Sequence, residues 1–145
     1  TMENAMGTVE ITAENFEETV KSNDIVLLDY WAEWCGPCKA FGPIFEKVSD
    51  DNPDIVFGKV DTEKEQQLAA AFKIRSIPTL MVFKEGVLVF SQAGMLPEPA
   101  LKDLVDKARE LDMEEVRQKI AEEEKEEKAE KAEKAEKAEG SEQPN

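Results

Sequence analysis

Apolar segments of strand length alternate with segments of helical periodicity along most of the chain, and this alternation restricts the possible folds more than any other feature. Residues 9–11 and 25–28 predict two strands, and residues 55–60 predict a third. The run at 25–28 is wholly apolar, as in a strand buried on both faces of a sheet. Residues 79–83 and 87–90 flank a short turn that contains a glycine, which predicts an antiparallel hairpin.

The segments between these strands are predicted to be helices with one apolar face. Thr12 is expected to cap the first of them, and residues 63–72 form a later one. Two helices have apolar residues at intervals of three and four: Phe41, Ile44, Phe45 and Val48 in one, and Leu101, Leu104, Val105, Ala108 and Leu111 in the other. Strands that alternate with helices and end in a hairpin indicate the α/β class, with a mixed sheet covered by helices on both faces.

The composition changes after the last of these helices. The last aromatic residue is Phe90, so a hydrophobic core can be built from residues 8–111 but not from residues 112–145. Asp112 is placed to start a further helix, and Lys-Ala-Glu then occurs four times in residues 128–139. We expect one domain followed by a charged extension. The extension is either a solvated helix or a fluctuating one, and it either increases solubility or docks a partner.

The net charge argues against two classes of partner. The chain has 33 acidic and 18 basic residues, which give a net charge of −15. Nucleic acids and anionic membrane surfaces are bound by basic patches, so we expect neither as a partner. The chain contains no apolar run of about 18 residues, the length that a transmembrane helix needs. Residues 1–7 contain no positive charge and no apolar stretch, so we expect no secretory signal and a cytoplasmic protein.

The chain has two cysteines, Cys35 and Cys38, in a C-x-x-C motif, and it has no histidine. A four-ligand zinc site would need carboxylates in place of the missing thiolates and imidazoles, which is uncommon, so no metal is expected. Without histidine, neither Cys–His nor Ser–His catalysis is available. Three roles remain for the pair: thiol–disulfide exchange, a structural disulfide, or an inactive buried pair. A disulfide across so short a loop adds little stability.

The motif lies where a predicted strand turns into a predicted helix. Cys35 is therefore expected near a helix N-terminus, where unpaired backbone N–H groups stabilise a thiolate. Its sulfur would attack a substrate disulfide, and Cys38 would resolve the mixed disulfide from the next turn. Gly36 and Pro37 are small and stiff, and we expect them to fix the loop while leaving Cys35 exposed.

Three motifs together carry a resemblance to a known family. Residues 29–39, Asp-Tyr-Trp-Ala-Glu-Trp-Cys-Gly-Pro-Cys-Lys, resemble the active-site segment of the thioredoxin family. Residues 75–80 resemble its second hallmark and Gly94 its third. The resemblance covers residues 8–111 and implies the thioredoxin fold and protein-disulfide reductase activity. It also implies a monomeric enzyme that uses no cofactor beyond its redox-active disulfide, acts on disulfide-containing client proteins and is recharged by a flavoprotein thioredoxin reductase.

The same resemblance implies roles for residues around the cysteines. Pro78 would be a cis proline that faces the disulfide, and Ile77 would offer main-chain groups to an extended peptide. Four further residues would complete a shallow docking surface: Trp34, Gly36, Pro37 and Gly94.

The resemblance also implies a proton relay. Asp29 would be a buried carboxylate beneath the cysteines, and burial should raise its pKa and so fit it to transfer the Cys38 proton through water. Lys59, on the neighbouring strand, would be its charge partner and would modulate that shift.

Two other functions use the same motif. A dithiol oxidant or isomerase of an oxidising compartment would run the exchange in another direction, although Gly36-Pro37 matches the reducing members and no secretory signal is predicted. A non-catalytic binding module would use the fold as a subunit or clamp and the extension to engage a partner. Such a module would not need both cysteines and Asp29.

Overall fold

The computed structural model describes residues 7–142. The expectation about a secretory signal concerns mainly residues 1–6, and these, like residues 143–145 of the predicted extension, lie outside the described residues. The chain divides into two compact units between Glu110 and Leu111. Within the described part of the chain, no helix is both long enough and apolar enough to cross a membrane.

The first unit contains a five-stranded mixed sheet, which confirms the predicted class. Its strands are β1 (Thr8–Glu10), β2 (Ile25–Trp31), β3 (Val56–Asp61), β4 (Thr79–Lys84) and β5 (Val87–Ala93). Their spatial order is β1-β3-β2-β4-β5. β1 and β2 are parallel to β3, whereas β4 is antiparallel to both of its neighbours. The apolar run predicted to be a buried strand is therefore the centre of the sheet.

The hairpin of β4 and β5 is longer than predicted. Glu85 and Gly86 form its loop with positive φ values of 51° and 81°, as a two-residue hairpin loop requires. β5 continues to Ala93, beyond the predicted end at Phe90. Its last three residues are polar or small and exposed on the edge strand, so they carry no hydrophobic signal in the sequence.

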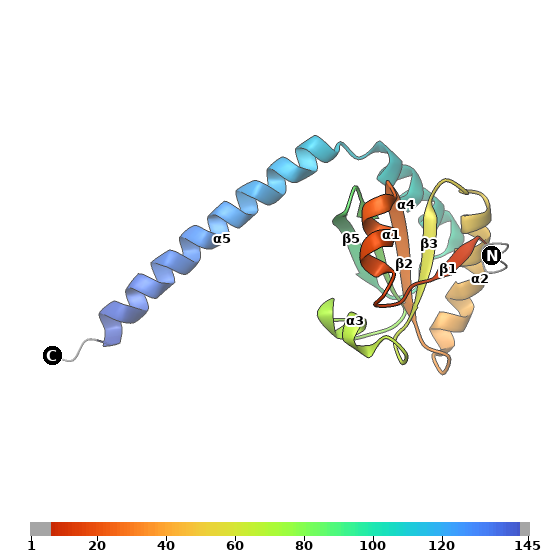
Figure 1. Cartoon of the computed structure of the whole chain (residues 1–145), viewed down its shortest axis with the longest axis horizontal. Coiled ribbons are helices and arrows are strands. Elements are labelled where there is room, and N and C mark those ends of the chain that lie inside the picture. Colours follow the sequence, from red (N-terminus) through yellow and green to blue (C-terminus); the bar gives the residue numbers. More distant parts are fainter. Residues whose placement is uncertain (1–6, 143–145) are drawn as a thin grey trace. The chain divides into compact units, whose positions relative to one another are not determined.

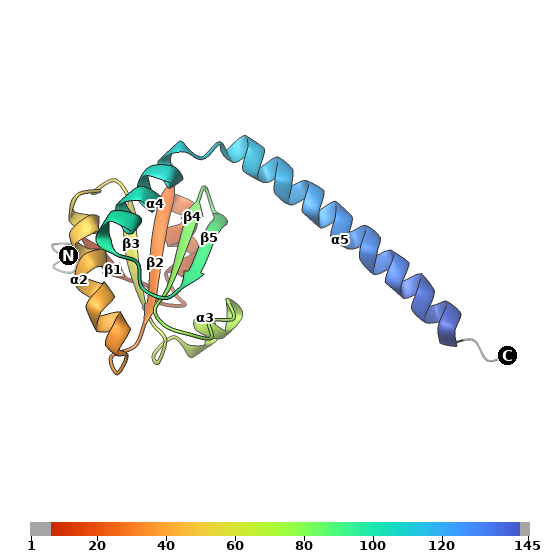
Figure 2. The ribbon, with the colours of Figure 1, turned by 180° about the vertical axis from the view of Figure 1, so that it is seen from behind.

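Helices cover both faces of the sheet, as predicted (Figures 1 and 2). α1 (Phe16–Ser22) and α3 (Gln66–Ala71) pack on one face, and α2 (Gly36–Asp50) and α4 (Glu98–Glu110) pack on the other. α2 continues without a break through Pro43, which the sequence places inside it.

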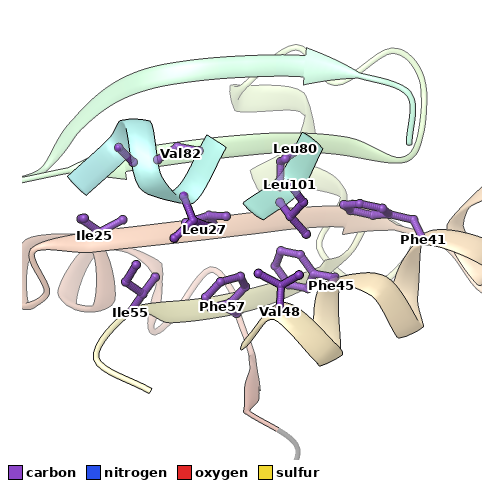
Figure 3. Close-up of a cluster of buried hydrophobic side chains, with 12 residues drawn as sticks. Ile25, Leu27, Phe41, Phe45, Val48, Ile55, Phe57, Leu80, Val82 and Leu101 are labelled. Atoms are coloured by element: carbon purple, nitrogen blue, oxygen red, sulfur yellow. The ribbon is translucent and has the colours of Figure 1, made fainter. Parts of the chain in front are cut away.

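The face beneath α2 and α4 buries the cluster of side chains in Figure 3. Ile25 and Leu27 of β2 belong to this cluster, together with Phe57 of β3 and Leu80 of β4. Each fully buried side chain of this size stabilises the fold by about 1.5–3 kcal/mol. Because successive strand residues point to opposite faces, Asp29 continues the row of Ile25 and Leu27 on this face. The sheet therefore places a carboxyl group at the end of an apolar layer.

The turn before α1 contains the predicted capping residue, but the regular helix begins four residues later. The Thr12 N–H donates to Asn15 Oδ1 at 2.8 Å, and the Asn15 N–H donates to Thr12 Oγ1 at 3.4 Å. This reciprocal pair orders a separate turn ahead of the helix. The helix begins at Phe16, whose N–H donates to the Thr12 carbonyl at 3.0 Å.

α3 is shorter than the predicted helix over residues 63–72. Asp61 Oδ1 accepts the N–H groups of Glu63 and Lys64 at 2.9 and 3.4 Å, which holds these residues in a turn before the helix. The other end is set by Lys73, whose φ of 55° is the left-handed conformation that ends helices.

The C-terminus of α4 is held by two basic side chains. The buried Lys84 of β4 donates from Nζ to the carbonyl oxygens of Ala108 and Arg109 at 2.7 and 3.1 Å. Carbonyl groups at a helix C-terminus lack partners within the helix and favour a nearby positive charge. Arg109 binds both carboxylate oxygens of Asp54, in the loop before β3, at 2.6 and 2.9 Å. Leu111 was predicted to lie on the apolar face of this helix, but it follows the helix end and is exposed.

The second unit is one helix, α5 (Met113–Glu142). Asp112 Oδ1 accepts the N–H groups of Glu114 and Glu115 at 3.0 and 3.3 Å, which confirms the predicted helix start. The side chains of residues 121–138 are all exposed. Of the two states that the sequence left open, the structure shows a regular solvated helix.

Candidate active site

The two cysteines lie at the junction of β2 and α2, as predicted. Cys35 is the N-cap of α2, and Cys38 lies in its first turn. Their sulfur atoms form a disulfide bond, with the Cα atoms 5.2 Å apart. The Cys38 N–H donates to Cys35 Sγ at 3.2 Å, so the sulfur takes the place of the oxygen that usually caps a helix. One of the unpaired donors at this helix N-terminus is thus directed at the Cys35 sulfur.

The expectation that Cys35 is the exposed member of the pair is wrong for the disulfide form. Both cysteines are 4% exposed. Ala32 is buried beside them, and Trp31 and Ile77 pack against this small cluster. The C-x-x-C spacing does not predict that Ile77 covers the sulfur atoms, because Ile77 comes from a loop 42 residues after Cys35. Access to the sulfur atoms is therefore narrow.

The loop before β4 approaches the disulfide, in agreement with the resemblance. The Ile77–Pro78 peptide bond is cis, as predicted. The Ile77 carbonyl oxygen lies 3.6 Å from Cys35 Sγ. A sulfur atom in a disulfide has no proton, so this is a packing contact rather than a hydrogen bond. The Gly94 N–H donates to the Pro78 carbonyl at 2.8 Å, and its φ of 96° is one that residues with a Cβ rarely adopt.

Exposed residues surround the nearly buried disulfide. Trp34 is 68% exposed, and Gly36 and Pro37 are exposed beside it. The indole N–H of Trp34 donates to the carboxylate of Glu63, in the turn between β3 and α3. Met95, which follows the glycine that bonds to the cis-proline loop, is 40% exposed. The predicted docking residues thus come from three segments: residues 34–37, the loop of Ile77 and Pro78, and Gly94, which is hydrogen-bonded to that loop.

Asp29 lies in the apolar layer beneath α2. Its side chain is fully buried, and within residues 7–142 neither of its carboxylate oxygens has a hydrogen-bond partner. Burial raises the pKa of Asp29 from 3.8 to about 7, because the charged form loses its hydration. The nearby Lys59 opposes this shift, and Glu46 adds to it. Asp29 can therefore gain or lose a proton near neutral pH.

Lys59 lies beside Asp29 but forms its ion pair with another carboxylate. The two residues are register partners on β3 and β2. Lys59 Nζ lies 3.7 Å from Glu46 Oε1 on α2, and 5.0 Å from the centre of the Trp31 ring. These three side chains line an open cleft of about 440 Å³. Lys59 thus acts on Asp29 through space, and its direct partner is Glu46.

Two residues of this site were not predicted from the sequence, Glu46 and Glu63. Each is one of 33 acidic residues, and nothing in the composition distinguishes it. Glu46 faces Lys59 only because the strand register brings Lys59 beneath α2. The one available signal was its position four residues after Gly42, which places both on the same face of the helix.

Thiol–disulfide exchange is the chemistry that this geometry supports, because a helix N-terminus stabilises the thiolate that such exchange needs. On this fold it defines a thiol–disulfide oxidoreductase. In the described part of the chain no three His, Cys, Asp or Glu side chains are arranged to hold a metal ion.

Comparisons with known proteins agree with this class. The thioredoxin family model matches residues 7–107. The chain is 61% identical over 117 residues to "Putative thioredoxin 2" of Streptomyces coelicolor, which covers 81% of this chain and 87% of that protein. It is 38% identical over 103 residues to the thioredoxin of Bacillus subtilis, which covers 70% of this chain and 98% of that protein.

A solved structure shows the same similarity. A mutant thioredoxin from Halobacterium salinarum superposes with a TM-score of 0.67 at 34% sequence identity, covering 72% of this chain and 93% of that one. The chain belongs to the thioredoxin family. It is a thiol–disulfide oxidoreductase, and its redox-active group is the pair Cys35 and Cys38.

Proposed function

We propose that the protein reduces disulfide bonds in client proteins, with Cys35 as the attacking nucleophile and Cys38 as the resolving thiol. The observation that carries this assignment is the Cys38 N–H directed at Cys35 Sγ at 3.2 Å. A helix N-terminus favours the thiolate over the thiol at this position. The Ile77 carbonyl, 3.6 Å from the same sulfur, marks the side on which an extended client segment would lie.

The exchange has two steps. The Cys35 thiolate attacks one sulfur of the client disulfide, so that the client S–S bond breaks and a mixed disulfide forms. The released client thiolate takes up a proton. Asp29 then accepts the Cys38 proton through water, and the Cys38 thiolate attacks the Cys35 sulfur. The mixed disulfide breaks, the second client sulfur leaves and is protonated, and the Cys35–Cys38 disulfide forms with two electrons transferred to the client.

Two groups of residues support these steps. Lys59, the register partner of Asp29, modulates the proton affinity of that carboxyl group. Client docking is assigned to the exposed border of the disulfide and to the loop beside it. Pro78 has no N–H, so the client backbone can approach it closely, while Ile77 offers its main-chain groups. The remaining docking residues are Trp34, Gly36, Pro37 and Gly94.

The physiological setting follows from the same proposal. A flavoprotein thioredoxin reductase would return two electrons to the Cys35–Cys38 disulfide, and the protein would act as a monomer in a reducing, cytoplasmic environment. Residues 8–111 would form the working domain, and residues 112–145 an accessory extension. The burial of Asp29 supports a catalytic protein over a binding module, because an unpaired buried carboxyl group is costly to keep without a chemical role.

Trapping of the mixed disulfide tests the roles of the two cysteines. Cys38→Ser removes the resolving thiol, so its reaction with insulin should stop at a covalent adduct visible on a non-reducing gel. Cys35→Ser is the matched control and should form no adduct and lose insulin reduction. Adduct formation by Cys35→Ser instead of Cys38→Ser would reverse the assignment, and no adduct from either variant would contradict the mechanism.

A further inference from the structure

The surroundings of Asp29 are apolar on most sides. Leu80 lies opposite it on β4, and the helix above it contributes Phe41 and Phe45 to the core. The redox-active Cys38 is on the same helix. Among the described residues, the charged groups that act on Asp29 are Lys59 of β3 and Glu46 of α2. The other charged side chains of the cleft lie along its walls: Glu10, Glu33, Asp61 and Lys64.

Lys59 is held by α2 rather than by its register partner. Its Nζ is 3.7 Å from Glu46 Oε1 and lies over the ring of Trp31. A Cβ placed on Gly42, one turn before Glu46, would be 3.6 Å from the same Nζ, an ordinary contact distance, so the ammonium group lies against this turn of α2. Asp29 makes no ion pair or hydrogen bond in the described part of the chain.

We propose that Glu46 is a positioning residue of the proton relay, which holds the Lys59 ammonium group in the cleft and away from the Asp29 carboxyl group. The inference rests on the proposed role of Asp29. The Lys59 ammonium group acts on both carboxylates, and it forms its ion pair with Glu46, the more exposed of the two. The Lys59 side chain is 24% exposed and the Glu46 side chain 34%, so both remain free to adjust in the cleft.

Removal of the Glu46 charge lowers the pKa of Asp29 in two ways. Lys59 loses its direct partner and is attracted more strongly to Asp29, and the repulsion between the two carboxylates disappears. Both effects stabilise ionised Asp29. The first effect requires Lys59 and the second does not, so a double-mutant cycle separates them.

The test is an NMR titration of the Asp29 carboxyl carbon in the disulfide form, in which neither cysteine titrates. The signal is assigned by its loss in Asp29→Asn. We expect Glu46→Gln to lower the titration midpoint by about 0.5–1 pH unit. In a Lys59→Met background the same substitution should lower it by less than half as much. Glu46→Asp keeps the charge with a shorter reach, and its midpoint should fall between those of the native protein and Glu46→Gln.

Glu33→Gln is the matched control, because it removes a carboxylate from the same cleft that is not paired with Lys59. It should leave the midpoint in place. An unchanged midpoint in Glu46→Gln would overturn the proposal. Equal shifts with and without Lys59 would also overturn it, because Glu46 would then act by its own charge alone. The titration does not depend on turnover. It therefore tests the role of Glu46 even if the kinetics of Asp29→Asn show that Asp29 does not transfer the Cys38 proton.

Discussion

The burial of Asp29 has a free-energy cost that depends on pH. The pKa of this carboxyl group is about 7 in the folded protein, against 3.8 for an unperturbed aspartate. Below pH 4 it is protonated in both the folded and the unfolded chain, and the cost is absent. Between pH 4 and 7 the unfolded chain loses the proton first, so the free energy of unfolding falls as the pH rises. Above pH 7 the full cost remains.

Asp29→Asn should therefore stabilise the protein at alkaline pH and not at acid pH. The shift of the pKa to about 7 corresponds to an increase in the free energy of unfolding of up to about 4 kcal/mol at pH 8. At pH 4 the variant and the native protein should differ little. Urea denaturation of both at the two pH values measures the difference, with Glu33→Gln as a surface control. An equal effect at both pH values would show that Asp29 is not buried as an uncharged acid.

The same substitution should change the pH dependence of catalysis. Asp29 must be ionised to accept the Cys38 proton, so the rate of insulin reduction should fall as the pH drops below about 7. Asp29→Asn should reduce the rate and remove this limb of the profile. Single-turnover measurements with the fully reduced protein avoid any contribution from a reductase. A slower variant with an unchanged profile would assign Asp29 a structural role.

At the residue scale, the sequence was sufficient for the groups that lie within the motifs. Asp29, Cys35 and Cys38 occur in one continuous segment, and the cis bond before Pro78 follows from its family motif. The role of Glu46 could not be predicted from the sequence, because it depends on strand register and not on spacing along the chain. The cover that Ile77 places over the sulfur atoms was missed for the same reason.

At the scale of elements, replacing a glycine by alanine should have opposite effects on stability in α2 and in β3. Gly42 is buried in the middle of a helix, where glycine is a poor helix former, yet a Cβ there would meet Lys59 Nζ at an ordinary contact distance of 3.6 Å. Gly58 of β3 has no such room, because a Cβ there would lie 2.9 Å from Leu28 and would also collide with Ile11.

Gly42→Ala should raise the free energy of unfolding by about 0.5–1 kcal/mol, since it removes the entropic cost of a helical glycine. Gly58→Ala is its counterpart and should lower the free energy of unfolding by about 1–3 kcal/mol through overpacking. Chemical denaturation at pH 7 measures both. A destabilised Gly42→Ala would mean that Lys59 cannot make room for a methyl group.

The elements themselves were predicted well where an apolar pattern marks them, as in β2 and α2. Their ends were predicted less well, because polar contacts decide them. Asp61 holds Glu63 and Lys64 in a turn ahead of α3, and Lys73 ends that helix with a left-handed conformation. The exposed end of β5 is set by pairing with β4 and not by its own side chains.

At the scale of the whole molecule, the change in composition after residue 111 corresponds to a change in how the chain is stabilised. The first unit has a buried core on both faces of its sheet. α5 has exposed side chains over residues 121–138, so local charge pairs and the helical propensity of alanine have to maintain it. Alternating strands and helices predicted the first unit, whereas the sequence alone could not choose between a regular and a fluctuating extension.

Truncation after Leu111 should therefore leave the catalytic unit intact. We expect insulin turnover within about twofold of the full chain, because residues 121–138 of the extension are exposed and the redox-active cysteines lie in the first unit. The circular dichroism at 222 nm should lose the contribution of α5, while the thermal midpoint of the remaining unit changes little. A loss of turnover greater than about tenfold would assign the extension a direct part in catalysis.

The central claim is that the N-terminus of α2 holds the Cys35 sulfur as a reactive anion. Alkylation of the reduced protein with iodoacetamide, followed by mass spectrometry across a pH series, tests it most directly. The account predicts that Cys35 reacts first and reaches half of its maximal rate about one pH unit or more below a free cysteine. Alkylation of Cys35 with the pH dependence of an ordinary cysteine would contradict the account.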